Sequence, residues 1–187
     1  MTVPPEIRET LTALMAEYAM AIDDNRLEDW VELFDEACDY KIVTRENVEQ
    51  NLPNVLMWCD NKNMLRDRVQ SYRHVNLYNL HYDRHVLGPL RFTGNDGAIW
   101  RFDVSYSLFQ TELEGASRLF SVGKYRVEAL VAGAGARLKS VTVVADTGLV
   151  PSLLYFAGVL EALIGLILTS LAITGFTGML RSDGEHS

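Results

Sequence analysis

Three potential metal ligands alternate along the sequence at His81, Asp83 and His85. If this stretch is a strand, the three side chains share one face, because successive side chains of a strand point to opposite faces. Imidazole and carboxylate are the ligands of facial-triad iron sites, so a metal site is one interpretation. However, three ligands in a row on a straight strand do not converge readily on one ion. We therefore favour a polar network, in which Asp83 orients a histidine or pairs with Arg84 or Arg91. Of these partners we expect an arginine for Asp83, and we expect both histidines to hydrogen-bond to carboxylates or backbone carbonyls.

Acid–base catalysis inside an apolar cavity is a second interpretation. A carboxyl or imidazole group in such a cavity can serve as general acid or base, because loss of solvent brings a carboxyl pKa toward the working pH. The candidates are Asp39, Asp60, Asp83, Asp103 and His74. Spacing singles out none of them. The corresponding hypothesis is a free-standing isomerase, cyclase or dehydratase with a cone-shaped fold.

A dense mixture of arginine, tyrosine and histidine surrounds the alternating residues, over Met64–Gly88 and on to Arg91. Arginine and tyrosine are enriched at well-packed protein interfaces. We therefore predict that this region lies at a subunit interface rather than in a ligand pocket. The residues assigned to the predicted interface are Arg66, Asp67, Arg68, Arg73, His81, Asp83, Arg84 and His85.

The elements before this region are predicted to be mainly helical. Apolar residues recur at helical spacing from Ile7 to Ile22, and a second helix is expected from Leu27 with its apolar face reaching Phe34. A third helix is expected from Met64, with Asn61 as its N-cap. The segments between them are predicted as a strand at Cys38–Thr44, a loop at Arg45–Asn54, and either a strand or a helix entry at Val55–Cys59.

The second half of the chain is predicted to be a sheet. Its strand candidates, separated by glycine-containing turns, are His81–Phe92, Ala98–Leu113, Ser117–Val131 and Ala136–Thr147. Helices first and an antiparallel meander last indicate an α+β protein, in which a curved, mainly antiparallel sheet wraps around the N-terminal helices.

Composition narrows the function classes. The chain has 187 residues, is 48% hydrophobic and carries a formal net charge of −8. This charge argues against a nucleic-acid surface, which needs clustered lysine and arginine. The two cysteines, Cys38 and Cys59, lack zinc-ligand spacing, and the N-terminus lacks a secretion-signal pattern. We therefore expect a reduced, cytoplasmic protein.

Several short motifs, in order, resemble those of the small (beta) subunits of aromatic-ring-hydroxylating dioxygenases. They are Thr44-Arg45-Glu46-Asn47, Cys59-Asp60-Asn61 leading into Met64-Leu65-Arg66-Asp67-Arg68-Val69, Tyr82-x-Arg84-His85, Asp146-Thr147 and Pro151-x-Leu153-Leu154. The resemblance covers residues 7–154. It implies a cone-shaped, NTF2-like (SnoaL-like) fold and a mainly structural subunit of an oxidoreductase complex.

The resemblance also implies where the chemistry lies. The chain itself is expected to hold no catalytic, cofactor-binding or metal-binding residue. The Rieske [2Fe–2S] cluster and the mononuclear iron are expected in a partner large (alpha) subunit, with three of each subunit in a hexamer and a small-subunit trimer within it. The amino-acid sequence of residues 45–53 and 82–89 is similar to that of family members acting on ortho-substituted benzoates, such as anthranilate or halobenzoates.

The resemblance places the folded domain at residues 1–154 and leaves 155–187 as an apolar C-terminal extension beyond the family's usual end. Residues 162–180 carry no charged side chain, and about 20 such residues can span a bilayer as a helix. Several glycine, serine and threonine residues make the segment only moderately apolar. A membrane or interfacial segment, a helix packed on a partner or on the sheet, and a poorly ordered extension all remain open.

Overall fold

The computed structural model describes residues 2–75 and 81–146. The helices are α1 (Pro5–Asp23), α2 (Leu27–Glu32), α3 (Arg45–Glu49) and α4 (Lys62–Val75). The strands are β1 (Phe34–Thr44), β2 (Met57–Cys59), β3 (His81–Leu87), β4 (Arg91–Asp96), β5 (Ile99–Glu112), β6 (Ser117–Ala132) and β7 (Gly135–Ala145).

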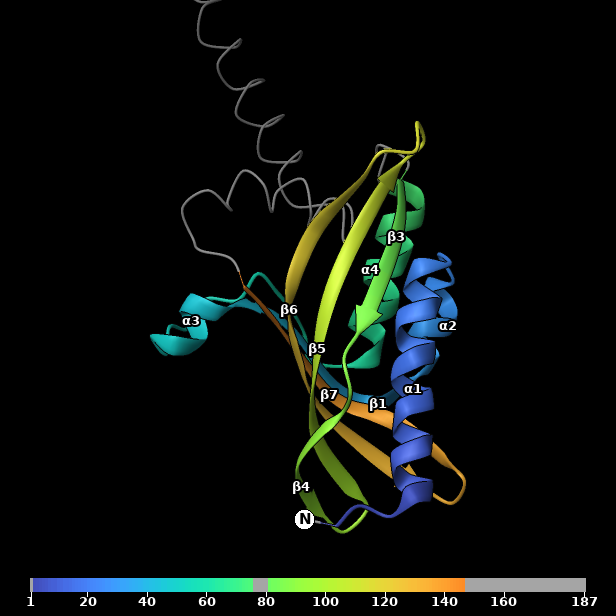
Figure 1. The fold of residues 1–187 in the computed structure, drawn as a ribbon, viewed down its shortest axis with the longest axis vertical. Helices are drawn as coiled ribbons and strands as arrows, with labels where there is room; N and C mark the ends of the chain where they lie inside the picture. The colour runs from blue at the N-terminus through green and yellow to red at the C-terminus, as the bar shows by residue number, and fades with distance from the viewer. Residues whose placement is uncertain (1, 76–80, 147–187) are drawn as a thin grey trace, which may run out of the picture.

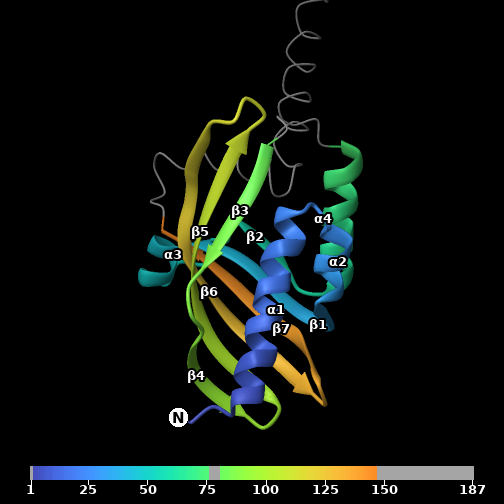
Figure 2. The same ribbon diagram turned by 45° about the vertical axis from the view of Figure 1, so that its right-hand side comes forward.

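The strands form one curved sheet in the order β2-β1-β7-β6-β5-β3, and β4 pairs with the other half of β5. All of the strand pairs are antiparallel except β1 with β7, which are parallel. Helices α1, α2 and α4 lie on one side of the sheet, and α3 lies apart from them (Figures 1 and 2). The predicted α+β class and the mainly antiparallel, curved sheet are confirmed.

The core lies between α1 and the concave face of the sheet. Proline is tolerated at the start of α1, since the first helical N–H groups have no partner within the helix. The apolar stripe of α1 buries Leu11, Met15 and Tyr18. Alternate residues of β5, among them Phe102 and Val104, belong to the same buried cluster. The sheet and its helices are therefore held together by one continuous apolar core.

Two local predictions around the central region are confirmed. Asn61 begins α4, where its side-chain oxygen accepts a hydrogen bond from the backbone N–H of Met64 at 3.0 Å. In β3, burial alternates residue by residue, so that His81, Asp83 and His85 face inward. The expected common face of these three residues is therefore present.

Two other predictions are wrong in their boundaries. The segment predicted as a loop from Arg45 begins with the short helix α3, because the buried Thr44 hydroxyl accepts a hydrogen bond from Asn47 N–H at 3.2 Å and caps it. Phe34, expected on the apolar face of the second helix, instead begins β1 as a fully buried residue.

The strand predicted from His81 to Phe92 is divided into β3 and β4 at Gly88 and Pro89. Both strands pair with β5, on the same edge of the sheet. A Cβ atom at Gly88 would lie 2.3 Å from the hydroxyl oxygen of Ser105, so a larger residue would not fit without displacing that side chain. Pro89 has no N–H to continue the strand pairing.

The apolar extension at 155–187, including residues 162–180, lies outside the described residues. Within residues 2–75 and 81–146, no helix is long and apolar enough to cross a membrane.

Candidate functional site

The charged residues of α4 largely contact neighbouring elements of the same chain. Arg73 donates through Nε and Nη2 to the two carboxylate oxygens of Glu28 on α2, at 2.9 and 2.8 Å, and also binds Asn25. These hydrogen bonds lower the pKa of Glu28 to about 2. Arg73 therefore fixes α4 against the start of α2.

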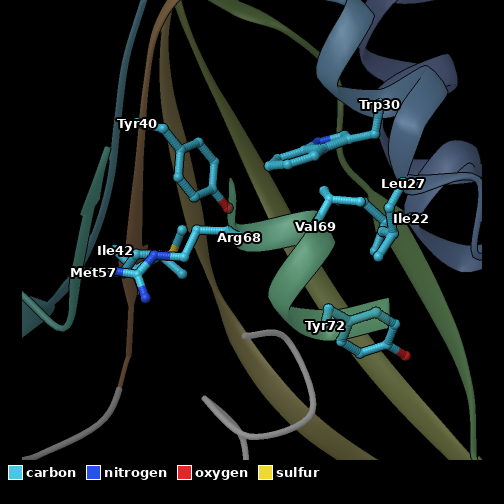
Figure 3. A pocket seen from close by; sticks show the side chains of 9 residues that line it. All are labelled: Ile22, Leu27, Trp30, Tyr40, Ile42, Met57, Arg68, Val69 and Tyr72. Carbon is cyan, nitrogen blue, oxygen red and sulfur yellow. The ribbon is translucent and has the colours of Figure 1, made fainter. Parts of the chain in front are cut away.

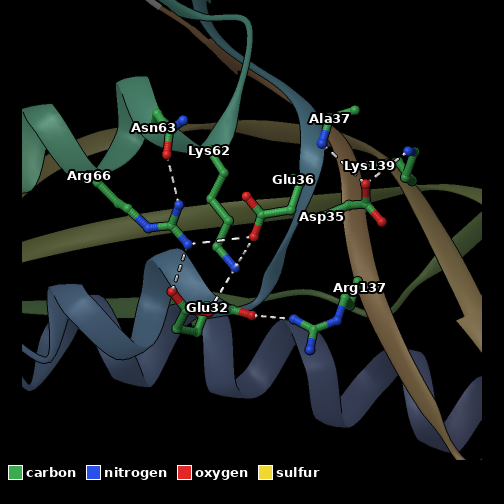
Figure 4. Close-up of polar contacts among 9 residues, drawn as sticks. All are labelled: Glu32, Asp35, Glu36, Ala37, Lys62, Asn63, Arg66, Arg137 and Lys139. Atoms are coloured by element: carbon green, nitrogen blue, oxygen red, sulfur yellow. Dashed lines mark hydrogen bonds and ion pairs between the residues drawn. The ribbon is translucent and has the colours of Figure 1, made fainter.

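A second group of charges joins the first turns of α4 to α2 and β1 (Figure 4). The buried Lys62 contacts Glu32 at 2.7 Å and Glu36 at 3.5 Å, and Arg66 contacts the same two carboxylates at 3.3 and 3.5 Å. Arg66 is thus engaged within the chain, although its side chain remains 41% exposed. The adjacent Asp67 is exposed.

The inward face of β3 carries a buried histidine–carboxylate contact, whose partner residue was not identified from the sequence. His85 Nδ1 lies 2.5 Å from Asp23 Oδ1, and the His85 backbone N–H donates to Asp23 Oδ2 at 2.8 Å. The two side chains are 4% and 2% exposed. Burial alone would raise the Asp23 pKa, but the hydrogen bonds from His85 outweigh it and lower the pKa. The predicted carboxylate partner of His85 is confirmed, and it comes from the end of α1.

The partner of Asp83 is a histidine, one of the two alternatives considered, and the preferred arginine partner is wrong. The Asp83 carboxylate lies 3.6 Å from His81 Nε2. Burial raises the pKa of Asp83, against the opposing effects of His81 and of a hydrogen bond with Gln110. The reason is the strand geometry, because Arg84 projects to the opposite face, where its side chain is 61% exposed.

No group of three histidine, cysteine, aspartate or glutamate side chains within the described ranges is placed to hold a metal ion. The free thiols of Cys38 and Cys59 are buried, and burial raises the pKa of Cys38 to about 11. Cluster ligation needs thiolates. A neutral buried thiol and a histidine held by Asp23 do not fit an iron–sulfur ligand set.

The remaining acid–base candidates do not enter the cone. Asp39 contacts Lys41 at 2.9 Å and Trp58 at 2.7 Å, and Asp103 contacts Arg91 at 3.3 Å. Both lie between buried neighbours on their strands and so face outward. Asp60 and His74 are exposed. Of the acid–base candidates named from the sequence, only Asp83 lies inside.

An apolar patch covers the outer face of β3, β5 and β6. Tyr82, Val86, Phe109 and Leu119 are 63%, 54%, 37% and 54% exposed. Arg84 pairs in register with Phe109, and Phe109 pairs with Leu119, so these side chains lie on one face. Phe109 and Leu119 were missed from the sequence. The alternation of β5 could have revealed Phe109, because the residues on either side of it are buried.

The predicted interface residues therefore do not form one surface. Arg66 and Arg73 join helices within the chain, and Arg68 lines a hollow between α4 and the sheet (Figure 3). His81, Asp83 and His85 face the interior, whereas Arg84 lies on the outer patch, although its guanidinium also lies 3.8 Å from Asp23. Contact of these residues with another subunit stays a prediction.

Residues 17–152 match the family model for the ring hydroxylating beta subunit. The chain belongs to this family. It is 39% identical over 142 residues to the anthranilate 1,2-dioxygenase small subunit of Burkholderia cepacia, covering 75% of this chain and 88% of that protein. The predicted dioxygenase small-subunit resemblance is thus confirmed.

Solved structures agree with this assignment. A Novosphingobium aromaticivorans structure assigned as the beta subunit of an aromatic-ring-hydroxylating dioxygenase has a TM-score of 0.71 and 38% identity, covering 79% of this chain and 94% of that chain. Another structure from the same organism, assigned as a scytalone dehydratase, has a TM-score of 0.57 and 11% identity, covering 74% and 83%. The second likeness shows the cone-shaped fold alone, so the fold by itself does not separate a subunit from an enzyme.

Proposed function

We propose that this chain is the non-catalytic, structural small subunit of a Rieske-type aromatic-ring-hydroxylating dioxygenase. The observation that carries the proposal is the family match over residues 17–152, together with 39% identity to an anthranilate dioxygenase small subunit. The Rieske cluster and the mononuclear iron belong to a large subunit, in a cytoplasmic assembly with three of each subunit. The substrate class is an ortho-substituted benzoate, such as anthranilate or a halobenzoate.

The outer patch supports a role in assembly. Contiguous exposed apolar side chains, as at Tyr82, Val86, Phe109 and Leu119, mark interaction sites more often than ordinary surface. The patch also contains Arg84, and arginine with tyrosine is favoured at the centre of interfaces. We place the subunit contact at this patch rather than over the whole predicted interface.

Co-expression with the large subunit tests the assembly role. Val86→Asp and Leu119→Asp each place a charge on the patch without touching the core, so we expect both to reduce recovery of the complex. Val55→Asp is the matched control, because Val55 is 41% exposed and precedes β2, away from the patch. Normal recovery of the complex and unchanged size in solution for both patch variants would refute this interface.

Metal analysis tests the non-catalytic role. The chain purified alone should contain little iron and turn over no aromatic acid. His81→Ala and Asp83→Ala should change the activity of the reconstituted complex only as far as they change assembly. Near-stoichiometric iron in the parent chain that disappears in both variants would show instead that this chain carries a metal centre.

A free-standing acid–base enzyme is the second candidate. The observation in its favour is Asp83, whose pKa is raised by burial, next to His81 and on the same inner strand face as the His85–Asp23 pair. A general acid at neutral pH needs such a raised pKa. A neighbouring gene for a Rieske-type large subunit would favour the first candidate, and its absence would favour the second.

A further inference from the structure

A hollow opens between the helices and the sheet, separate from the outer patch. It is lined by residues of α1, α2, α4, β1 and β2, namely Ile22, Leu27, Trp30, Tyr40, Ile42, Met57, Arg68, Val69 and Tyr72. Figure 3 shows Arg68 reaching from α4 toward Ile42 and Met57, with Tyr40 and Trp30 on the adjoining wall. A cation thus stands beside a wall of aromatic and aliphatic side chains.

Arg68 differs from most other arginines of the described chain in its partners. Those that pair with a carboxylate are Arg26, Arg45, Arg66, Arg73, Arg84, Arg91 and Arg101. Within residues 2–75 and 81–146, Arg68 pairs with no carboxylate. Arg68 instead contacts the fully buried thiol of Cys59. Burial raises the pKa of that thiol, and the hydrogen bond and charge of Arg68 oppose the rise. The guanidinium therefore lies beside a neutral group and retains its capacity to bind an anion.

We propose that this hollow binds a small aromatic carboxylate, with the carboxylate on Arg68 and the ring against Trp30, Tyr40 and Val69. Guanidinium binds a carboxylate through two parallel N–H donors, which gives both charge and geometry. Ligand sites typically combine an apolar, aromatic lining with a few polar groups that fix orientation. A neutral aromatic compound would leave Arg68 unpaired, and a small aliphatic acid would leave the apolar wall uncovered.

Size limits how the ligand enters. The cavity volume is about 50 Å³, smaller than the ~150 Å³ apolar cavity that holds benzene in another protein. The rim residues Ile22, Leu27 and Tyr72 are only partly buried, unlike Trp30 and Val69 deeper in the wall. The ring therefore enters as these rim side chains rotate outward, and the carboxylate is held by Arg68. Binding is expected to be weak, because part of the interaction is offset by this rearrangement.

The site goes beyond the proposed function, because it lies wholly within this chain and does not depend on a large subunit. The test uses the full-length chain alone, with benzoate as the probe and isothermal titration calorimetry as the measurement. Benzyl alcohol supplies the same ring without the charge, and acetate supplies the charge without the ring. We expect benzoate to bind more tightly than either compound.

Two variants identify the cation. Arg68→Gln should weaken benzoate binding by at least about tenfold, the lower end for a hydrogen bond to a charged group, and leave benzyl alcohol binding unchanged. Arg66→Gln is the matched control one half-turn away, where the arginine contacts Glu32 and Glu36 outside the hollow. It should bind benzoate as the parent does. Equal benzoate affinity of parent and Arg68→Gln would overturn the proposal, as would undetectable benzoate binding by the parent.

A measurement on the unaltered chain covers the case in which Arg68→Gln does not fold. With labelled methionine methyl groups, benzoate ring protons should give nuclear Overhauser effects to the Met57 methyl. Effects confined to other methionines would place the ligand elsewhere and overturn the proposal. Since no large subunit is present in these experiments, their failure is distinguishable from failure of the complex to assemble.

Discussion

Asp23 and Asp83 both face the interior near β3, but the protein shifts their pKa values in opposite directions. For each, burial is the largest effect and raises the pKa. Asp23 receives hydrogen bonds from the ring and the backbone of His85, and these lower its pKa below the usual value. The effect of burial on Asp83 is opposed less strongly, since its Oδ1 is buried without a hydrogen-bond partner, and its pKa stays above the usual value.

The two shifts have opposite consequences for stability. Because its pKa is lowered, Asp23 contributes favourably to the free energy of unfolding above about pH 3.8, its pKa in the unfolded chain. This contribution is lost as the pH falls through the pKa of the folded state. Because its pKa is raised, Asp83 lowers the free energy of unfolding when it is ionised. This unfavourable contribution is absent well below pH 3.8 and complete above the pKa of Asp83 in the folded state. Acidification therefore removes the stabilising contribution of Asp23 and the destabilising contribution of Asp83.

This difference predicts the behaviour of Asp83→Asn. The amide removes the cost of burying a charge, so the free energy of unfolding of the variant, minus that of the parent, should rise between about pH 3.5 and pH 7. Urea denaturation at several pH values measures it. Asp103→Asn, a change on the outer face of the sheet, controls for the loss of one carboxylate. A difference that stays constant or falls with pH would contradict the raised pKa.

The sequence predicted the inward face of β3 but not the partner that makes it stable. The alternation of His81, Asp83 and His85 is a local pattern and could be read from a short stretch. Asp23 lies 62 residues away along the chain from His85, and only the packing of α1 against β3 brings the two together. The wrong arginine partner for Asp83 has the same origin, because Arg84 was close in sequence but lies on the other face.

At the level of elements, β6 depends on a close approach at Gly123. A Cβ atom there would lie 2.1 Å from the carbonyl oxygen of Val144 and 3.0 Å from Tyr106 Cε1. The backbones of β6 and β7 would have to separate to accept it. Gly135, at the start of β7, has open space around the same position.

Alanine substitution separates these two glycines. Gly123→Ala should lower the free energy of unfolding by about 1–3 kcal/mol, the usual cost of overpacking. Gly135→Ala should change it by less than about 0.5 kcal/mol, as at an unconstrained surface site. Urea denaturation of both variants is the measurement. Similar values for the two would show that β6 and β7 are not held at this distance.

Element boundaries were predicted best where a local signal was strong. The helical spacing of apolar residues from Ile7 to Ile22 predicted α1, and Asn61 predicted the start of α4. The helix α3 was missed because its five residues include a single apolar one, Val48, and so show no apolar period. It depends on Thr44 and on the side chain of Asn47, which donates to the Asn54 carbonyl at 2.8 Å. Gly88 and Pro89 are both residues that interrupt strands, and they mark the break between β3 and β4.

At the level of the whole molecule, we propose that residues 1–154 form the complete folding unit. The last described strand, β7, ends at Ala145, and the family match ends at residue 152. A chain ending at Leu154 should be soluble, unfold cooperatively and assemble with the large subunit as the full chain does. Circular dichroism, urea denaturation and co-purification measure these properties. Aggregation or loss of cooperative unfolding would show that residues 155–187 belong to the fold.

The division of the edge at Gly88 and Pro89 also bears on how copies of the chain can meet. The sheet order leaves β2 at one edge and β3 with β4 at the other. Long, flat edges recruit further strands, whereas short, kinked or charged edges prevent this. Here β2 has three residues, and the opposite edge is interrupted by Pro89 and carries Arg84 and Arg91. Among residues 2–75 and 81–146, neither edge offers a template for a continuous intermolecular sheet, so contacts that copies of the chain make at these edges should be formed by side chains rather than by backbone hydrogen bonds.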